Sequence, residues 1–199
     1  MNSTHPKLQS IDRIRSQFHG LAADTVALDG AAGTQVPEAV VEAVADAMRH
    51  AMANEHGYFA ASRPSTEAVA EARSALADLV GGVPEGVVLG PNMTTLTFHL
   101  ADALAKTWGP SDEIVVTSLD HDANITPWRL AAERVGATVR VADFNVETGE
   151  LPTEAVADCL SDRTRLVAVT AASNETGPSP DVRATGGAPA SASAWWPSK

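Results

Sequence analysis

The sequence predicts an α/β domain built on a mostly parallel sheet with helices on both faces. From about residue 86 onward, short apolar runs rich in valine and isoleucine alternate with stretches of helical periodicity. Strands that are apolar along their whole length belong to sheets buried on both faces, and parallel strands need crossover helices between them. No stretch approaches the roughly 18 uninterrupted apolar residues that a membrane span needs.

The chain before this alternation is predicted to be helical. Leu8, Ile11, Ile14 and Phe18 recur at helical spacing, and a longer apolar stripe follows Pro37, a residue that the first turn of a helix tolerates. Gly81 and Gly82 provide a helix stop. The expected elements, in order, are a helix over 8–18, an extended segment over 26–28, a helix over 37–53 and a helix over 64–80.

The second part of the chain supplies the predicted sheet. Its expected strands are 87–89, 114–117, 138–142 and 166–170, and its expected helices are 94–105, 123–134 and 153–160. Ligand sites in such sheets lie at the carboxyl ends of the strands. The segments that follow those ends are 90–95, 118–122, 143–145 and 172–175. We therefore look for chemistry in these four segments.

Composition excludes several classes of function. The chain has 199 residues, and 14 Lys and Arg against 25 Asp and Glu give a net charge of −11. It therefore carries no basic stripe to bind a nucleic-acid backbone. The single cysteine, Cys159, excludes an internal disulfide and a cysteine-cluster metal site, and it is most simply a small core residue. We expect a cytoplasmic protein, with no membrane or nucleic-acid partner.

A strand that runs into a helix at Gly90–Thr97 is the strongest local signal. The first turn of that helix carries Thr94 and Thr95. Free backbone N–H groups and the helix dipole hold a phosphate at such an end, and the threonine hydroxyls add donors. The alternative is that the threonines only cap the helix.

A second signal is the segment Asp120-His121-Asp122-Ala123-Asn124. A histidine between two carboxylates suits a general base or a metal ligand, or the two aspartates only cap the next helix. Asn174, in Ser173-Asn174-Glu175-Thr176-Gly177, equally suits a simple turn.

Together these segments resemble one family. The elements Leu28–Pro37, Asn92–Thr95, His121–Trp128 and Ser173–Gly177 are similar, in order and spacing over roughly residues 24–182, to the class V aminotransferases. Within that family the closest resemblance is to the cysteine desulfurase-like proteins. The resemblance implies a fold-type-I pyridoxal-phosphate (PLP) enzyme that acts as a homodimer, of which this chain is a truncated N-terminal portion. Full-length relatives would act on an amino acid through a PLP aldimine.

The resemblance also assigns cofactor-binding residues. Thr94 and Thr95 correspond to the turn that anchors the phosphate, Asn174 to the asparagine that binds the phenolic oxygen, and Asn124 to the motif asparagine beside the ring. In cysteine desulfurases the motif reads E-H-H-A-N, and its second histidine stacks on the pyridine ring. Asp122 stands at that position here. Because a carboxylate cannot stack, ring packing must differ.

The family's catalytic lysine, ring-nitrogen aspartate and substrate arginine all lie beyond the asparagine that Asn174 matches. None of the three lysines, Lys7, Lys106 and Lys199, falls at the catalytic position, so we assign no catalytic residue. We expect the chain to be inactive alone.

The predicted organisation has three parts. Residues 1–60 form a segment that packs with the small domain of full-length relatives, residues 61–182 form the first half of the PLP-binding large domain, and residues 183–199 form a disordered, non-native tail. Two other functions stay open: a non-catalytic module that pairs with a full-length homologue, and an unrelated nucleotide-binding domain. The absence of a G-x-G-x-x-G fingerprint argues against the nucleotide.

Overall fold

The computed structural model describes residues 10–21, 26, 28–177 and 179–182. Its internal contacts divide the chain into two units, Met1–Val88 and Leu89–Lys199. The sequence instead places a domain boundary near residue 60. The predicted tail, 183–199, lies outside the described residues.

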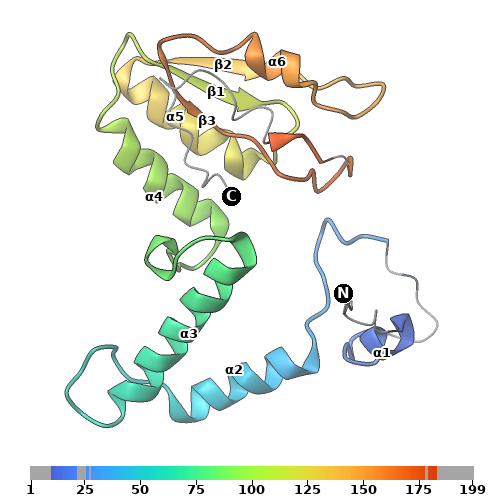
Figure 1. The fold of residues 1–199 in the computed structure, drawn as a ribbon, viewed down its shortest axis with the longest axis vertical. Coiled ribbons are helices and arrows are strands. Elements are labelled where there is room, and N and C mark those ends of the chain that lie inside the picture. The colour runs from blue at the N-terminus through green and yellow to red at the C-terminus, as the bar shows by residue number, and fades with distance from the viewer. Residues whose placement is uncertain (1–9, 22–25, 27, 178, 183–199) are drawn as a thin grey trace, which may run out of the picture. The chain divides into compact units, whose positions relative to one another are not determined.

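The first unit is helical (Figure 1). It contains α1 (Ile11–Arg15), α2 (Glu38–His50), α3 (Ser62–Val80) and the 3-10 turn η1 (Pro84–Gly86). The helix α3 packs against α2 and η1. It ends at Gly81, whose φ of 67° is left-handed and favours glycine. The three helices expected here are confirmed, each within a few residues.

Two buried serines of α3 organise the turn between α2 and α3. The Ser62 hydroxyl donates to the Asn54 carbonyl over 2.5 Å and accepts from the Gly57 backbone N–H over 2.7 Å. The Ser65 hydroxyl donates to the Ala51 carbonyl over 2.6 Å. These bonds satisfy polar groups that burial would otherwise leave without partners.

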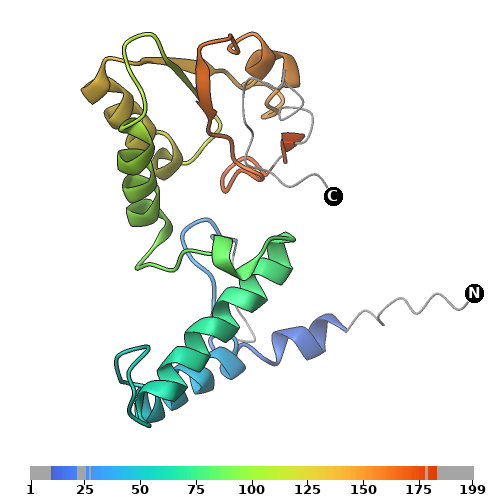
Figure 2. The same cartoon turned by 60° about the vertical axis from the view of Figure 1, so that its left-hand side comes forward.

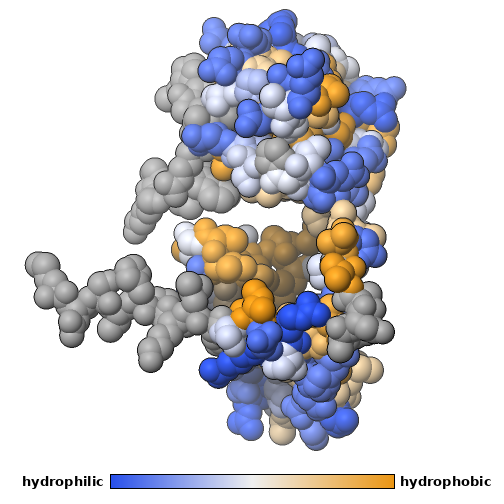
Figure 3. Space-filling model, turned by 90° about the vertical axis from the view of Figure 1, so that its right-hand side faces the viewer, coloured by the Kyte–Doolittle hydropathy of each residue, from blue (hydrophilic) through white to orange (hydrophobic). Residues whose placement is uncertain are grey.

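The first unit buries little apolar surface. Among its described residues, Ala77 alone is an apolar side chain with almost no exposure. The apolar stripe of α2 is 46–76% exposed, and Figure 3 shows exposed apolar side chains on this unit. We define the α2 stripe as Val40, Val41, Val44, Met48 and Met52.

The second unit is a parallel sheet in the order β2-β1-β3. The strands are β1 (Glu113–Thr117), β2 (Thr138–Ala142) and β3 (Thr164–Val167). Its helices are α4 (Met93–Ala105), α5 (Thr126–Val135) and α6 (Thr153–Ala157), and a 3-10 turn, η2 (Asp122–Asn124), follows β1. The central strand β1 is buried along its whole length, as its apolar sequence predicts.

Helices cover both faces of this sheet (Figure 2). Ile114 and Val116 of β1 face one cluster with alanines of α4 and α5 and with Trp128. Val115 faces the other cluster, which includes Val156 of α6. Successive residues of a strand point to opposite faces, so a continuously apolar β1 supplies both clusters. The α/β class, the parallel sheet and its double cover are confirmed.

Two buried carboxylates lie at the start of β1, at the end of the strand opposite the cavity described below. Glu113 is 2% exposed and forms ion pairs with Arg140 and Arg163. The Ser161 hydroxyl that donates to Glu113, together with these two guanidinium groups, holds its pKa below the ordinary value. Hydrogen bonds from Arg165 and from the Gly109 backbone likewise lower the pKa of Asp112.

Several expected elements differ from those observed. The predicted strand 87–89 is wrong, since this segment has no ladder partner in the described sheet and Val88 is 71% exposed. The helix expected over 123–134 is divided into η2 and α5 at Ile125. The helix expected over 153–160 ends earlier, at Ala157, and the last strand lies at 164–167 instead of 166–170. In the described part of the chain, no helix is long and apolar enough to cross a membrane.

Candidate functional site

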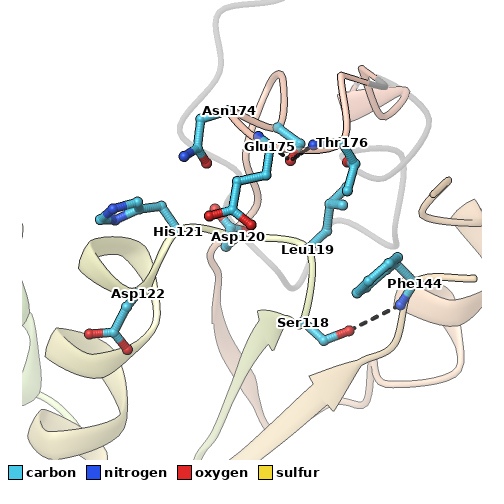
Figure 4. A pocket seen from close by; sticks show the side chains of 10 residues that line it. Ser118, Leu119, Asp120, His121, Asp122, Phe144, Asn174, Glu175 and Thr176 are labelled. Carbon is cyan, nitrogen blue, oxygen red and sulfur yellow. Dashed lines mark hydrogen bonds between the residues drawn. The ribbon is translucent and has the colours of Figure 1, made fainter. Parts of the chain in front are cut away.

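A cavity of about 260 Å³ opens at the carboxyl ends of the three strands. Figure 4 shows His121 and Asn174 on one side of it and Phe144 with Ser118 on the other. The loops after β1, β2 and β3 supply its walls, as the strand-end rule predicts. The lining residues are Ser118, Leu119, Asp120, His121, Asp122, Phe144, Ser173, Asn174, Glu175 and Thr176.

His121 shapes the turn that follows β1. Its Nδ1 atom accepts a hydrogen bond from the Ala123 backbone N–H over 3.0 Å and so caps η2. The alternative that Asp120 and Asp122 only cap the next helix is not observed, because α5 has no side-chain cap and Asp122 accepts from the Thr126 hydroxyl over 2.7 Å.

No group of three or more metal-ligating side chains is present among the described residues. The metal-ligand alternative for His121 therefore gains no support from its neighbours.

Both polar atoms of the Asn124 side-chain amide form hydrogen bonds within the chain. Its Nδ2 atom donates to Asp120 over 2.8 Å, and its Oδ1 atom accepts from the Trp128 indole N–H over 3.0 Å. Asn124 does not line the cavity. Its amide therefore supports the turn that carries His121 and Asp122.

Asn174 projects from a tight turn. The Ser173 hydroxyl accepts from the backbone N–H groups of Glu175 and Thr176 over 3.3 and 3.2 Å. Gly177 closes the turn with a φ of 83°, which favours glycine. The Asn174 amide is exposed and has no hydrogen-bond partner in the described part of the chain. It is available to a ligand.

The start of α4 offers donors for an anion. The Asn92 side chain caps this helix by accepting from the Thr95 backbone N–H over 2.8 Å. The backbone N–H groups of Met93 and Thr94 have no partner among the described residues, nor do the hydroxyls of Thr94 and Thr95. Thr94 is exposed and Thr95 is half-buried. Such a helix end binds phosphate well.

The cavity wall is acidic. Asp120, Asp122 and Glu175 line it, and no lysine or arginine does among the described residues. Lys106 caps the opposite end of α4 from Thr94. The described lining therefore offers no lysine or arginine to pair with an anion.

The cavity gathers part of the predicted site. Asp122 and Asn174 line it together, whereas Thr94, Thr95 and Asn124 do not. The helix α4 nevertheless packs against η2, the turn between Asp122 and Asn124. The sequence does not reveal the role of Asp120, because one of its partners, the Thr170 backbone N–H, lies 50 residues away. The Trp128 indole, by contrast, donates to Asn124 only four residues earlier, and no role was predicted for it from the sequence.

Comparison with known families gives a match over most of the chain. The family model described as "Aminotransferase class-V" matches residues 26–191. That range includes the larger part of each structural unit.

Curated relatives share this similarity. An uncharacterised protein of Mycobacterium tuberculosis is 40% identical over 174 residues, which cover 87% of this chain and 44% of the relative. A cysteine desulfurase of Cronobacter sakazakii is 35% identical over 191 residues, which cover 88% of this chain and 46% of the relative. The chain thus spans less than half the length of the curated relatives it matches.

Solved structures agree in fold. The apo structure of a cysteine desulfurase from Thermococcus onnurineus superposes with a TM-score of 0.80 at 25% identity, covering 90% of this chain and 44% of that one. The cysteine desulfurase CsdA of Escherichia coli superposes with a TM-score of 0.74 at 29% identity, covering 87% of this chain and 44% of that one. A C-DES mutant with glycine covalently linked to its PLP cofactor superposes with a TM-score of 0.62 at 25% identity, covering 77% of this chain and 39% of that one.

Proposed function

Because the chain belongs to the class V aminotransferase family, we propose that it supplies the phosphate-anchoring helix and part of the amino-acid cavity of a PLP-dependent enzyme. The observation that carries the proposal is the start of α4, with its unpartnered N–H groups and threonine hydroxyls. A similar solved structure, the C-DES mutant, holds PLP with glycine attached.

The described residues fit this cofactor in part. Unpaired N–H groups at a helix start suit its phosphate, and the free Asn174 amide suits its phenolic oxygen. Asn124 contributes by supporting the turn beside the ring, since both polar atoms of its amide are already bonded. Lys106, at the far end of α4, is the one lysine in the described part of the chain, so the group that reacts with the cofactor's aldehyde is proposed to come from elsewhere.

PLP supplies an electron sink for reactions at the α- or β-carbon of an amino acid. The residues of this chain would hold its phosphate, orient its ring and line the space for the substrate. Asp122 occupies the position where desulfurases of this family stack a histidine on the ring, and a carboxylate cannot stack. The proposal therefore covers a PLP reaction on an amino acid and leaves open whether it is desulfuration.

Equilibrium dialysis of the full chain against PLP tests the proposal. We expect weak binding that inorganic phosphate displaces and that pyridoxal, which lacks the phosphate, does not reproduce. Replacing Thr94 and Thr95 together by alanine should weaken binding about tenfold or more, because a hydrogen bond to a charged group contributes about 1.5–3 kcal/mol. Thr97→Ala is the matched control, since that hydroxyl donates within α4 to the Met93 carbonyl. Equal binding of PLP and pyridoxal would contradict the proposal.

A second candidate is a non-catalytic module that pairs with a longer homologue. The exposed α2 stripe favours it, because a surface of this kind is normally covered by another part of a protein. In the family-based organisation, residues 1–60 would pack with the small domain and two subunits would form a dimer. Co-expression of this chain with a full-length homologue distinguishes the two candidates. A module that pairs with the homologue co-purifies with it in a fixed ratio, whereas an isolated portion of an enzyme does not. A cytoplasmic location stays a prediction from the sequence.

A further inference from the structure

The carboxylate of Asp120 joins three segments of the second unit. Its Oδ2 atom accepts from the Thr117 hydroxyl over 2.6 Å and from the Thr170 backbone N–H over 3.0 Å. Its Oδ1 atom accepts from the Asn124 side chain over 2.8 Å. These donors belong to the end of β1, the segment that follows β3, and η2.

This network continues into the core. Asn124 accepts from the indole N–H of Trp128, which is 5% exposed and packs against β1 and α4. Thr117, the donor at the strand end, is fully buried. The network is partly buried, and hydrogen bonds that link several side chains in this way fix the positions of its members.

The network connects two walls of the cavity. One wall is the segment 118–122, which contains Asp120, and the other is 173–176, three residues after Thr170. His121, rather than Asp120, caps η2. Because protein donors from three segments occupy both carboxylate oxygens of Asp120, this residue is suited to holding the two walls together.

We propose that Asp120 is a positioning residue that fixes the spacing between the wall carrying His121 and Asp122 and the wall carrying Asn174. The relevance of this spacing to PLP rests on the proposed function, but the spacing itself does not. Asp120 acts through Asn124 and through the Thr170 backbone.

Substituting asparagine shows why the network needs one acid and one amide. In Asp120→Asn the new NH₂ group meets either the Thr170 backbone N–H or the NH₂ group of Asn124, depending on how the new amide is turned. If Asn124 also turns over, its NH₂ group meets the indole N–H of Trp128 instead. Two donors face each other in every arrangement, so one bond is always lost and the link to the segment at Thr170 is weakened.

The exchanged pair Asp120→Asn with Asn124→Asp restores every bond. Residue 120 then accepts from Thr117 and Thr170 with its carbonyl oxygen and donates to the new carboxylate at 124. That carboxylate also accepts from Trp128. Net charge and side-chain volumes are unchanged, so recovery in the double variant identifies the hydrogen-bond network itself.

Hydrogen exchange measured by mass spectrometry on the full chain tests the proposal. In Asp120→Asn we expect the segment 170–176 to exchange about tenfold faster or more, from the lost bond and the unpaired donor, while peptides covering β1 and β2 change little. The exchanged pair should restore native rates. Asp158→Asn, an exposed aspartate at the end of α6, is the matched control and should change nothing in this segment.

Two readouts separate this proposal from the proposed function. Unchanged exchange in Asp120→Asn, or failure of the exchanged pair to restore it, overturns the positioning role. An equal increase across β1 and β2 also overturns it, because that result marks general destabilisation. If exchange behaves as expected but the unaltered chain binds no PLP in dialysis, the positioning role stands and the proposed function fails.

Discussion

At the scale of single residues, Asn92 has two separable effects on the anion site of α4. Its side chain caps the helix through the Thr95 N–H. We expect Asn92→Ala to destabilise the first turn by about 1 kcal/mol, the usual effect of losing a cap. Asn92→Asp should keep the cap but weaken PLP binding, because a carboxylate beside the phosphate repels it.

Hydrogen exchange of residues 93–97 and PLP dialysis check this prediction together. Native exchange with weaker binding in Asn92→Asp supports the anion site. Unchanged binding in that variant would contradict a phosphate at the start of α4.

Cys159 gives a prediction about reactivity. Burial raises the pKa of its thiol above the ordinary value of 9.0, in spite of the nearby charge of Arg140. A higher pKa leaves less thiolate at pH 8, and the thiolate is the reactive form. We therefore expect iodoacetamide to label Cys159 more slowly in the native chain than in denaturant at the same pH. Equal rates would show that α6 does not shelter this thiol, and fast native labelling would suit a reactive cysteine instead.

At the scale of elements, the buried acids at the start of β1 predict acid sensitivity of the sheet. The folded-state pKa values of Asp112 and Glu113 lie below the ordinary values of 3.8 and 4.5. Groups with depressed pKa values stabilise the fold above their unfolded-state pKa, and this stabilisation is lost as pH falls through the folded-state pKa. Protection of β1 and β3 against hydrogen exchange should therefore decline below about pH 4.5, the ordinary value for Glu113.

The Glu113→Gln variant tests the origin of this acid sensitivity. It removes the charge that Arg140 and Arg163 face, so we expect weaker protection of β1 at pH 7 and a shallower decline in acid. Glu147→Gln, at an exposed position, serves as the control. An acid profile in Glu113→Gln identical to that of the unaltered chain would exclude Glu113 as a cause.

Local sequence patterns predicted the helices and strands that pack against one another in the described structure. The bounds of β2 agree at both ends, and the ends of α3 and α4 agree within two residues, because caps, glycines and apolar periodicity mark them. Val87–Leu89 has the composition of a strand, but a strand also needs a neighbour, which composition cannot report. The strand-end rule located all three cavity loops. It could not find the Asp120 network, since Thr170, unlike Thr117 and Asn124, is distant in the sequence and meets Asp120 only when the sheet forms.

At the scale of the whole molecule, the exposed α2 stripe predicts association. Its five side chains are 46–76% exposed, and their unit buries only Ala77 among its described apolar residues. We expect the chain alone to self-associate or aggregate in light scattering, because large exposed apolar patches promote contacts between molecules. Replacing Val44 and Met48 by glutamate should reduce association, whereas Glu42→Gln should not. A monodisperse monomer with one cooperative thermal transition would contradict this account.

We propose that this chain holds the phosphate of PLP and that none of its own lysines reacts with the aldehyde. Borohydride reduction of the full chain with PLP, followed by peptide mapping, tests the statement about lysine most directly, while the dialysis against PLP and pyridoxal tests the phosphate site. We predict no stoichiometric pyridoxyl adduct at any single lysine, and only low, scattered modification that the Thr94 and Thr95 substitutions leave unchanged. A stoichiometric adduct on Lys106 that disappears when Thr94 and Thr95 are replaced by alanine would contradict the claim.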